Sequence, residues 1–234
     1  MELSSEELQA WGESFETKQP QEVLAAAIER YSPKIVLACS FGVEDVVLLD
    51  MVHRVNPSVP LFYLDTEFLF PETYATRDRV IERYGLQPQQ VMQVKSLLTP
   101  EQQAAQHGEA LWTRQPDQCC ELRKVEPLTR VLKGFDAWIT GIRRDQSPTR
   151  AHAKLIEWDQ KFQLVKINPL AKWKWEDVWT YIRIYEVPYN ELHDRNYPSI
   201  GCTYCTSPVM PGEDPRAGRW KNFTKTECGL HKAS

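Results

Sequence analysis

The chain has 234 residues, a length that allows one large α/β domain with extensions or at most two small domains. Its hydrophobic fraction of 42% and its charged fraction of 26% are those of an ordinary globular protein. The sequence contains no apolar run near the roughly 20 residues that span a bilayer, which argues against a membrane protein. The formal net charge of −4 argues against a general nucleic-acid binder.

The first twelve residues are acidic and polar, and they lack the basic start and apolar core of a signal peptide. We therefore expect a cytoplasmic protein. Thiols stay reduced in that compartment, so paired cysteines favour metal binding or catalysis over structural disulfides.

The elements alternate along the chain between helices and short apolar strands. Residues 4–15 have a helical pattern that begins with a capping box between Ser4 and Glu7, and 21–31 have the pattern of a second helix. Strands are then predicted at 34–40, 60–65, 90–95 and 137–141, a hairpin at 155–158 and 163–167, and helices at 46–55, 71–84, 99–108, 121–132 and 173–185. This alternation predicts an α/β fold with a parallel sheet and helices on both faces.

The regular pattern ends near Tyr189, where the sequence becomes polar and rich in proline and glycine. The stretch 211–218 has the composition of a linker. The sequence therefore predicts one α/β domain over 1–210 and a mobile C-terminal tail over 211–234.

Small and polar residues follow several predicted strands. Ser40 and Gly42 lie in the turn after the first strand, and Gly141 ends the fourth. Such turns let backbone N–H groups and a helix N-terminus meet an anion or nucleotide at the carboxyl edge of a parallel sheet. Many ordinary turns between a strand and a helix look the same, so the motif is weak by itself.

Four cysteines form two pairs that are far apart in the sequence: Cys119 with Cys120, and Cys202 with Cys205. Thiolates select Zn²⁺, Cu(I) or iron–sulfur clusters. Adjacent cysteines chelate one ion poorly because their side chains diverge, whereas a cluster offers each thiolate its own iron. The pattern favours an iron–sulfur cluster over zinc or no metal, while Cys39 lies in an apolar strand and is interpreted as packing.

A sixth cysteine, Cys228, lies in the predicted tail. Lys225 and His231 can favour its thiolate, and Gly229 leaves it unencumbered, so we interpret it as a nucleophile rather than an inert residue. The other histidines, at 53, 107, 152 and 193, are interpreted as ordinary polar positions, and the tryptophans at 173, 175 and 179 as core or interface residues.

Arginines and lysines gather in two places along the chain. The first group is Arg143, Arg144 and Arg150, and the second is Arg216, Arg219, Lys221 and Lys225. Local basic groups on a mildly acidic protein fit a small polyanionic ligand better than a duplex, although a solvated basic surface is the alternative.

Together these motifs resemble one known family. They are Ser-Phe-Gly-Val-Glu-Asp-Val-Val (40–47), Leu-Asp-Thr (64–66), Pro-Glu-Thr-Tyr (71–74), Cys-Cys-x-x-Arg-Lys (119–124), Thr-Gly-x-Arg-Arg-Asp-Gln-Ser-x-x-Arg (140–150), Gly-Cys-x-x-Cys-Thr (201–206), Pro-Arg-x-Gly-Arg-Trp (215–220) and Glu-Cys-Gly-Leu-His (227–231). The chain resembles, over nearly its whole length, the assimilatory adenylyl-sulfate reductases, the thioredoxin-dependent, cysteine-quartet branch of the phosphoadenylyl-sulfate (PAPS) reductase family.

The resemblance implies an adenine-nucleotide α-hydrolase-like fold of the PP-loop type, with a [4Fe–4S] cluster held by Cys119, Cys120, Cys202 and Cys205. The implied nucleotide contacts are Ser40, Phe41, Gly42, Leu64 and Gly141. Lys124, Arg150, Arg216 and Arg219 would hold the phosphosulfate, and His231 would lie beside the nucleophile. The loop before Arg150 and the segment from Arg219 to Cys228 look shorter than in some relatives.

The resemblance also implies a reaction. The Cys228 thiolate would attack the sulfur of adenylyl sulfate, expel AMP and form an S-sulfocysteine, from which thioredoxin or a glutaredoxin-like reductant would release sulfite. Such an enzyme, adenylyl-sulfate reductase (thioredoxin), serves sulfate assimilation and cysteine biosynthesis.

Other functions stay open at this point. The nearest is a PAPS reductase or a dual-substrate enzyme. A PP-loop tRNA-thiolating enzyme would want Ser-Gly-Gly-x-Asp-Ser where this chain has Ser-Phe-Gly-Val-Glu-Asp (40–45), and an iron–sulfur sensor would not need Cys228. The sequence leaves open whether the protein is a monomer or a homo-oligomer.

Overall fold

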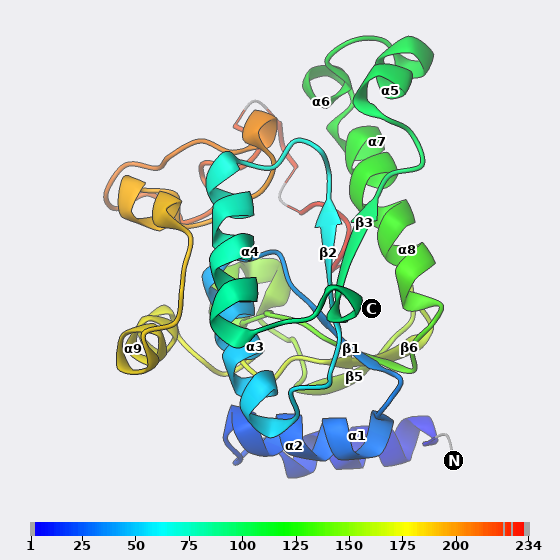
Figure 1. Cartoon of the computed structure of the whole chain (residues 1–234), viewed down its shortest axis with the longest axis vertical. Helices are drawn as coiled ribbons and strands as arrows, with labels where there is room; N and C mark the ends of the chain where they lie inside the picture. The colour runs from blue at the N-terminus through cyan, green and yellow to red at the C-terminus, as the bar shows by residue number, and fades with distance from the viewer. Residues whose placement is uncertain (1–2, 222, 226, 232–234) are drawn as a thin grey trace.

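The computed structural model describes residues 3–221, 223–225 and 227–231 (Figure 1). The chain begins with α1 (Ser5–Ser14) and α2 (Pro20–Tyr31), which lie together at one end of the molecule. The predicted capping box is present at the start of α1, where Ser4 N donates to Glu7 Oε2 at 2.8 Å and Glu7 N donates to Ser4 Oγ at 3.2 Å. Two of the four N–H groups that every helix start leaves unpaired are thereby satisfied.

A six-stranded sheet forms the centre of the fold, in the order β3-β2-β1-β4-β6-β5. The strands are β1 (Ile35–Ala38), β2 (Leu61–Asp65), β3 (Val91–Lys95), β4 (Ala137–Ile139), β5 (Ile156–Asp159) and β6 (Leu164–Ile167). All neighbours are parallel except β5 and β6, which form an antiparallel hairpin at one edge. This confirms the predicted strands, and the order reverses at β1, where such sheets commonly bind ligands.

Helices cover both faces of the sheet, as predicted (Figure 1). Odd and even residues of β1 divide between the faces, because side chains alternate along a strand. Ile35 and Leu37 join a core with buried residues of α2, α3 (Val43–Val55) and α9 (Trp175–Tyr185), while Val36 joins a second core with α8 (Glu126–Leu132). The predicted packing role of the tryptophans is confirmed, since Trp173, Trp175 and Trp179 pack against the first core.

The helix predicted at 121–132 begins earlier and is irregular. It comprises α7 (Pro116–Cys120), a π-helical turn (Glu121–Val125) and α8, in which Glu126 N donates to the Glu121 carbonyl. Pro127 has no N–H with which to continue the regular α-helical pattern, and π-helical turns occur mostly as single interruptions of an α-helix, frequently at functional sites. Before this stretch lie α5 (Pro100–His107), which confirms the helix predicted at 99–108, and the short α6 (Leu111–Arg114), which was not predicted.

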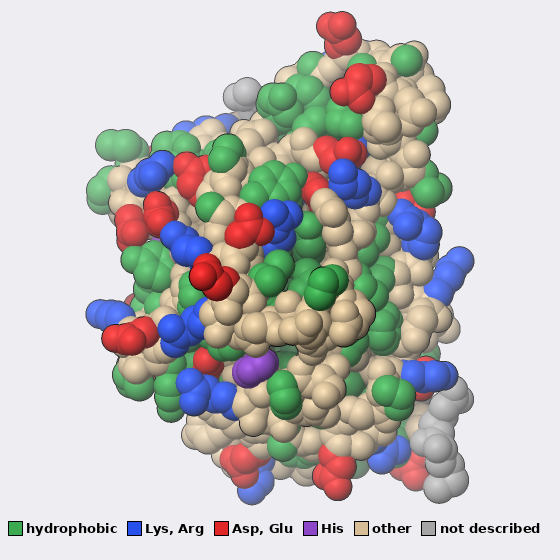
Figure 2. All heavy atoms as spheres, in the orientation of Figure 1, with side chains coloured by type: hydrophobic (Ala, Val, Ile, Leu, Met, Phe, Trp, Pro, Cys, Tyr) green, Lys and Arg blue, Asp and Glu red, His purple; other side chains and the backbone are tan. Residues whose placement is uncertain are grey.

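Helix α4 (Pro71–Tyr84) matches its predicted bounds and ends at Gly85, whose φ of +59° suits a residue without Cβ. Figure 2 shows acidic and basic side chains interspersed over this face of the molecule. Arg79 of α4 pairs with Glu191, and Arg195 pairs with Glu72. These pairs join α4 to the segment after α9.

After α9 the described chain runs as loops and short 3₁₀ turns, at Glu191–Arg195 and Thr203–Cys205. Single bridges connect Leu69 with Cys202 and Thr206 with Arg219, so this segment lies against the end of β2 and then folds back on itself. The mobility of 211–234 stays a prediction, and residues 222, 226 and 232–234 of that range lie outside the described residues. Within the described ranges, no helix combines the length and the apolar character that a bilayer crossing needs.

Candidate active site

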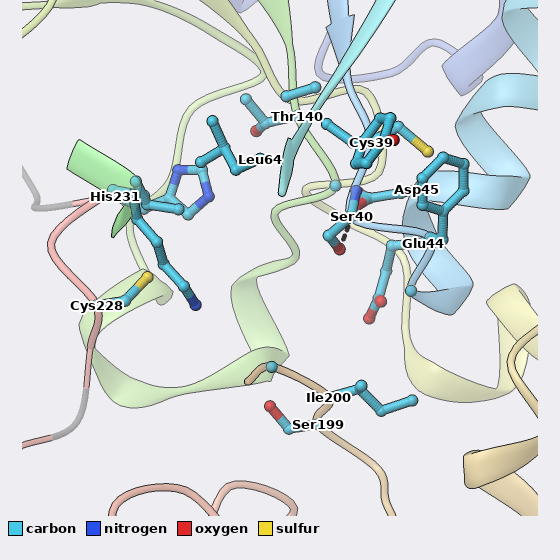
Figure 3. Close-up of a pocket in the computed structure, with 18 of the residues that line it drawn as sticks. Cys39, Ser40, Glu44, Asp45, Leu64, Thr140, Ser199, Ile200, Cys228 and His231 are labelled. Atoms are coloured by element: carbon cyan, nitrogen blue, oxygen red, sulfur yellow. Dashed lines mark hydrogen bonds between the residues drawn. The ribbon is translucent and has the colours of Figure 1, made fainter. Parts of the chain in front are cut away.

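A pocket of about 240 Å³ opens at the carboxyl edge of the parallel strands. Its wall includes Ala38 at the end of β1, Leu64 of β2 and Thr140 after β4. Cys228 and His231 lie on one side of the space, and Ser40, Glu44 and Asp45 lie on the other (Figure 3). The strand ends thus meet where the sequence predicted. All the predicted catalytic and substrate-binding residues line this one pocket: Ser40, Phe41, Gly42, Leu64, Lys124, Gly141, Arg150, Arg216, Arg219, Cys228 and His231.

The turn between β1 and α3 is fixed by its own side chains. Ser40 donates from both its backbone N and its Oγ to Asp45 Oδ2, each at 2.6 Å. Phe41 has a φ of +59° and is 1% exposed, with its ring at the edge of Tyr63, so packing holds a backbone conformation that side chains rarely adopt. Burial raises the pKa of Asp45 to about 6, although the Ser40 hydrogen bonds act in the opposite direction.

Gly141 is required by a close approach between the end of β4 and the first turn of α3. A Cβ at this position would lie 2.9 Å from Glu44 Cβ and even closer to Asp45 Oδ1. Glu44 in turn accepts from Arg143 Nε and from Gln146 Nε2, each at 3.0 Å. The loop after β4 is therefore locked to the first turn of α3, and Arg143 of the first basic group serves this lock rather than the pocket.

Cys228 enters the pocket from the tail and is half-buried. Burial raises its pKa, but the Lys124 ammonium, the Leu230 N–H and the Arg219 guanidinium outweigh burial and leave the pKa below that of an ordinary thiol. Burial lowers the pKa of Lys124, but the charges of Cys202, Cys228 and Cys120 outweigh burial and raise the pKa above its ordinary value. The Lys124 ammonium therefore interacts both with the Cys228 thiol in the pocket and with Cys120 and Cys202 of the paired cysteines.

Two of the three predicted arginines share an acidic partner, and the third has contacts of its own. Arg150 and Arg216 both pair with Glu227, at 2.8 Å and 3.2 Å. Arg219 donates from Nη1 to Ser199 Oγ at 3.1 Å, and its guanidinium lies 4.4 Å from the centre of the Trp220 ring. Its Nε is buried without a hydrogen-bond partner among the described residues. An unpaired buried guanidinium N–H in a pocket wall is suited to an anionic ligand.

His231 stacks on Trp138, with ring centroids 5.6 Å apart and planes at 17°. Burial lowers its pKa well below the usual value, and the charges of Lys166, Arg150 and Arg216 lower it further. The ring is therefore neutral near pH 7. Its Nδ1 is buried and has no partner in the described part of the chain, so the imidazole can offer a hydrogen bond but not a positive charge.

The four paired cysteines line a second, smaller cavity beside the pocket, and Lys124 borders both. Thr66 Oγ1 lies 3.3 Å from Cys202 Sγ, and Gln103 Nε2 lies 3.9 Å from Cys119 Sγ. Burial raises the pKa of Cys119 to about 11 and that of Cys120 to about 12. Within the described ranges, no group of three or more His, Cys, Asp or Glu residues is arranged to hold a single metal ion.

The donor set at this cavity fits an iron–sulfur cluster. Four thiols from two distant segments face one space, and soft thiolates are the usual ligands of such clusters. The aromatic residues Phe68, Trp112 and Tyr204 also line this cavity, and the rings of Trp112 and Tyr204 stack with centroids 3.9 Å apart. A cationic centre would stabilise the thiolates, whose charge burial otherwise disfavours.

Several residues of the site escaped sequence reasoning. His193, interpreted as an ordinary polar position, lines the pocket, and burial lowers its pKa to about 4. The aromatic residues that line the cysteine cavity, Phe68, Trp112 and Tyr204, were also missed, because the sequence marks them only as aromatic positions in separate segments. Cys39 is 2% exposed in the main core, as predicted, and also borders the pocket.

Known proteins share both the sequence and the fold. The chain is 50% identical over 220 residues to the adenosine 5'-phosphosulfate reductase of Halalkalibacterium halodurans, and these residues make up 94% of each chain. It is 50% identical over 211 residues to adenosine 5'-phosphosulfate reductase 2 of Bacillus subtilis, or 90% of this chain and 89% of the relative.

Solved structures agree on the fold. The PAPS reductase of Candida auris superposes with a TM-score of 0.78 at 33% identity, over 89% of this chain and 99% of the other. The FMN adenylyltransferase of Candida glabrata, at 16% identity and a TM-score of 0.60, covers 99% of this chain and 79% of the other, and shares the fold alone. The family described as "Phosphoadenosine phosphosulfate reductase domain" matches residues 34–208, and the chain belongs to this family.

Proposed function

We propose that the protein is a thioredoxin-dependent adenylyl-sulfate reductase, which converts adenosine 5'-phosphosulfate to sulfite and AMP. One observation carries the proposal: a thiol of lowered pKa and the predicted arginines line the same pocket as the turn at the carboxyl edge of the sheet. The 50% identity to proteins with the name adenosine 5'-phosphosulfate reductase supports this substrate.

The nucleotide end of the substrate lies at the sheet edge in this proposal. Ser40, Phe41, Gly42, Leu64 and Gly141 contact the adenosine and its phosphate, where the pocket borders the N-terminus of α3. The sulfate end points toward Lys124, Arg219 and the other two arginines. Charge-assisted hydrogen bonds from these groups offset the charge of the phosphosulfate.

The reaction begins when the Cys228 thiolate attacks the substrate sulfur. A bond forms between the two sulfur atoms while the bond from the substrate sulfur to the bridging oxygen breaks, and AMP leaves with the bonding electrons. Lys124 and the arginines stabilise the negative charge that grows on the bridging oxygen. His231 is neutral, and in this scheme it holds the substrate through a hydrogen bond from its ring.

A thioredoxin thiolate then attacks the Cys228 sulfur of the S-sulfocysteine and expels sulfite. A second thioredoxin thiol resolves the mixed disulfide and restores Cys228. Two thioredoxin thiols are oxidised to a disulfide as the substrate sulfur is reduced by two electrons. The mobile tail 211–234 would let Cys228 face first the pocket and then this partner.

Cys119, Cys120, Cys202 and Cys205 hold a [4Fe–4S] cluster in this proposal. When bound, the cluster supplies an electrostatic and structural element beside Lys124, and the scheme above draws no electron from it. Lys124 keeps its own role, since its charge reaches both the cysteine cavity and Cys228. The proposal places the protein in the cytoplasm, in sulfate assimilation and cysteine biosynthesis.

Use of 3'-phosphoadenylyl sulfate is the second candidate, because the solved relative from Candida auris carries the name PAPS reductase. Sulfite release on both nucleotides separates the two activities. We expect the larger kcat/KM with adenylyl sulfate.

The decisive experiment follows Cys228 by mass. Wild-type protein with adenylyl sulfate and no thioredoxin should gain one sulfonate group on the Cys228 peptide and release one AMP per site. Thioredoxin should remove that mass. The Cys228→Ser variant should bind adenylyl sulfate, keep its iron and release no sulfite. An adduct on another cysteine, or turnover by Cys228→Ser, would overturn the mechanism.

A further inference from the structure

Glu227, the residue before the proposed nucleophile, forms ion pairs with two of the arginines assigned to the substrate's anionic end. Arg150 grips its carboxylate with two bonds, from Nε to Oε1 at 3.0 Å and from Nη2 to Oε2 at 2.8 Å. Arg216 Nη2 donates to Oε2 at 3.2 Å. Ser147 and Thr149 add hydroxyl donors to Oε1, at 3.4 Å and 3.2 Å.

These contacts form a nearly dry ion site. The side chains of Glu227, Arg150 and Arg216 are 12%, 11% and 16% exposed. Burial raises the pKa of Glu227, but the bonds and charges of the two arginines outweigh it and leave the pKa below the ordinary value. A carboxylate held by a two-pronged arginine and a second guanidinium has the contacts of a bound oxyanion ligand.

We propose that Glu227 is an internal competitor for the anion subsite: its carboxylate fills the Arg150–Arg216 pair when substrate is absent, and the phosphosulfate must displace it to bind. This inference rests on the proposed function, which assigns those arginines to the substrate. Glu227 is a positioning residue in this view, because it acts on the reaction through the arginines and through the placement of Cys228.

Two further contacts of the described part of the tail involve neither Arg150 nor Arg216. Lys161 Nζ donates to the Gly229 carbonyl at 2.9 Å, and Lys225 pairs with Asp117. Displacement of Glu227 therefore removes one set of tail contacts and leaves the others, these two among them, in place. The position of Cys228 then depends on whether a carboxylate or a ligand holds the arginines.

A competitor inside the protein lowers the apparent affinity for the ligand, because only the fraction with open arginines binds. Loss of the competing carboxylate should thus tighten binding, whereas loss of a structural contact should weaken it or leave it unchanged. This difference in sign separates a competitor from a residue that only supports the fold.

The test measures adenylyl sulfate binding by calorimetry in the non-reacting Cys228→Ser background. Addition of Glu227→Gln should lower Kd by about fivefold or more, on the basis of an arginine pair that is mostly occupied. Glu227→Ala should change Kd in the same direction. Asp117→Asn is the matched control, because it also converts a carboxylate that pairs with the tail to an amide, and it should leave Kd within about twofold. An unchanged or weaker Kd with Glu227→Gln would refute the competition.

A second measurement needs no substrate and tests whether Glu227 restrains the tail and thereby shields Cys228. The limiting rate of Cys228 alkylation by iodoacetamide at high pH, with the site identified by peptide mass, should be at least about threefold higher in Glu227→Gln than in wild type. The limiting rate is used so that a changed thiolate fraction does not enter. Equal rates would count against the inference. If Cys228→Ser does not bind adenylyl sulfate at all, the proposed function fails, and this alkylation comparison still decides whether Glu227 restrains the tail.

Discussion

The two sides of the pocket are built by different forces. The nucleotide side, from Ser40 to Asp45 with Gly141, is part of the main core: Phe41 and Val43 are each 1% exposed, and the turn is closed by its own hydrogen bonds. The tail side is held by ion pairs to Glu227 and Lys225, by the His231 ring stacked on Trp138 and by Leu230 packed on the second core. Buried apolar packing resists local opening, whereas contacts of charged groups can be exchanged for those of a ligand. One side of the pocket is therefore a fixed surface and the other a replaceable one.

The largest expected effect tests the cysteine cavity on the tail side. Cys202→Ser should lose the iron and the visible absorbance of anaerobically purified protein, together with most activity, because one of four thiolate ligands is gone. Cys39→Ser is the control on the fixed side and should retain the iron and the activity, since Cys39 packs in the main core and does not line the cysteine cavity. Iron and acid-labile sulfide analysis provides the measurement. Stoichiometric zinc in the wild type would contradict the cluster.

The fixed side can be broken by one methyl group. Gly141→Ala should destabilise the protein by about 1–3 kcal/mol and weaken AMP binding, because its Cβ would overlap Glu44 and Asp45. A Cβ at Gly134 would meet only the Val131 carbonyl at 3.7 Å, so the stability of Gly134→Ala should stay within about 0.5 kcal/mol of wild type. Urea unfolding and AMP titration measure both. Equal behaviour of the two variants would show that the turn yields more readily than its packing indicates.

Lys124 interacts electrostatically with Cys228 on the tail side and with the neighbouring cysteine cavity. Its ammonium helps to lower the Cys228 pKa, so Lys124→Met should move the midpoint of the alkylation pH profile upward. Each unit of that shift reduces the thiolate fraction near pH 7 by about tenfold. Lys133→Met removes an exposed lysine beyond α8 and should leave the midpoint in place. A profile that does not move in Lys124→Met would exclude this lysine as the activating charge.

The smallest effect concerns His193, which packs against Trp175 and Trp179. Burial lowers its folded pKa to about 4, below the usual value near 6.5, so the unfolded chain takes up the proton first. The stability that the neutral ring contributes is therefore present above about pH 6.5 and is lost as the pH falls toward 4. His193→Asn should reduce the slope of unfolding free energy against pH in this range by up to about 1.4 kcal/mol per pH unit. Urea unfolding between pH 7 and 5 should show no such reduction for the exposed His152→Asn.

Sequence patterns predicted those parts of the molecule in which near neighbours determine the structure. The strand ends at Ser40 and Gly141 followed from apolar runs and turn residues, and helix α4 followed from Pro71 and Gly85. The partner of Arg150 did not, because Glu227 lies 77 positions away and pairs with it only in the folded chain. The buried setting of His193 depends likewise on rings from α9, and no local pattern records such a contact.

The π-helical turn at Glu121–Val125 acts as a rotational spacer. On one side of it, Cys119 and Cys120 face their cavity, and on the other, Leu128 and Leu132 pack on the sheet. Each residue of an α-helix advances the side chains by about 100°, so deletion of one residue from this turn would twist one group away from its target. The wide turn allows a single helical stretch to meet two surfaces whose directions a regular helix would not match. A chain shortened by one residue here should keep either its cysteine geometry or its packing on the sheet, but not both.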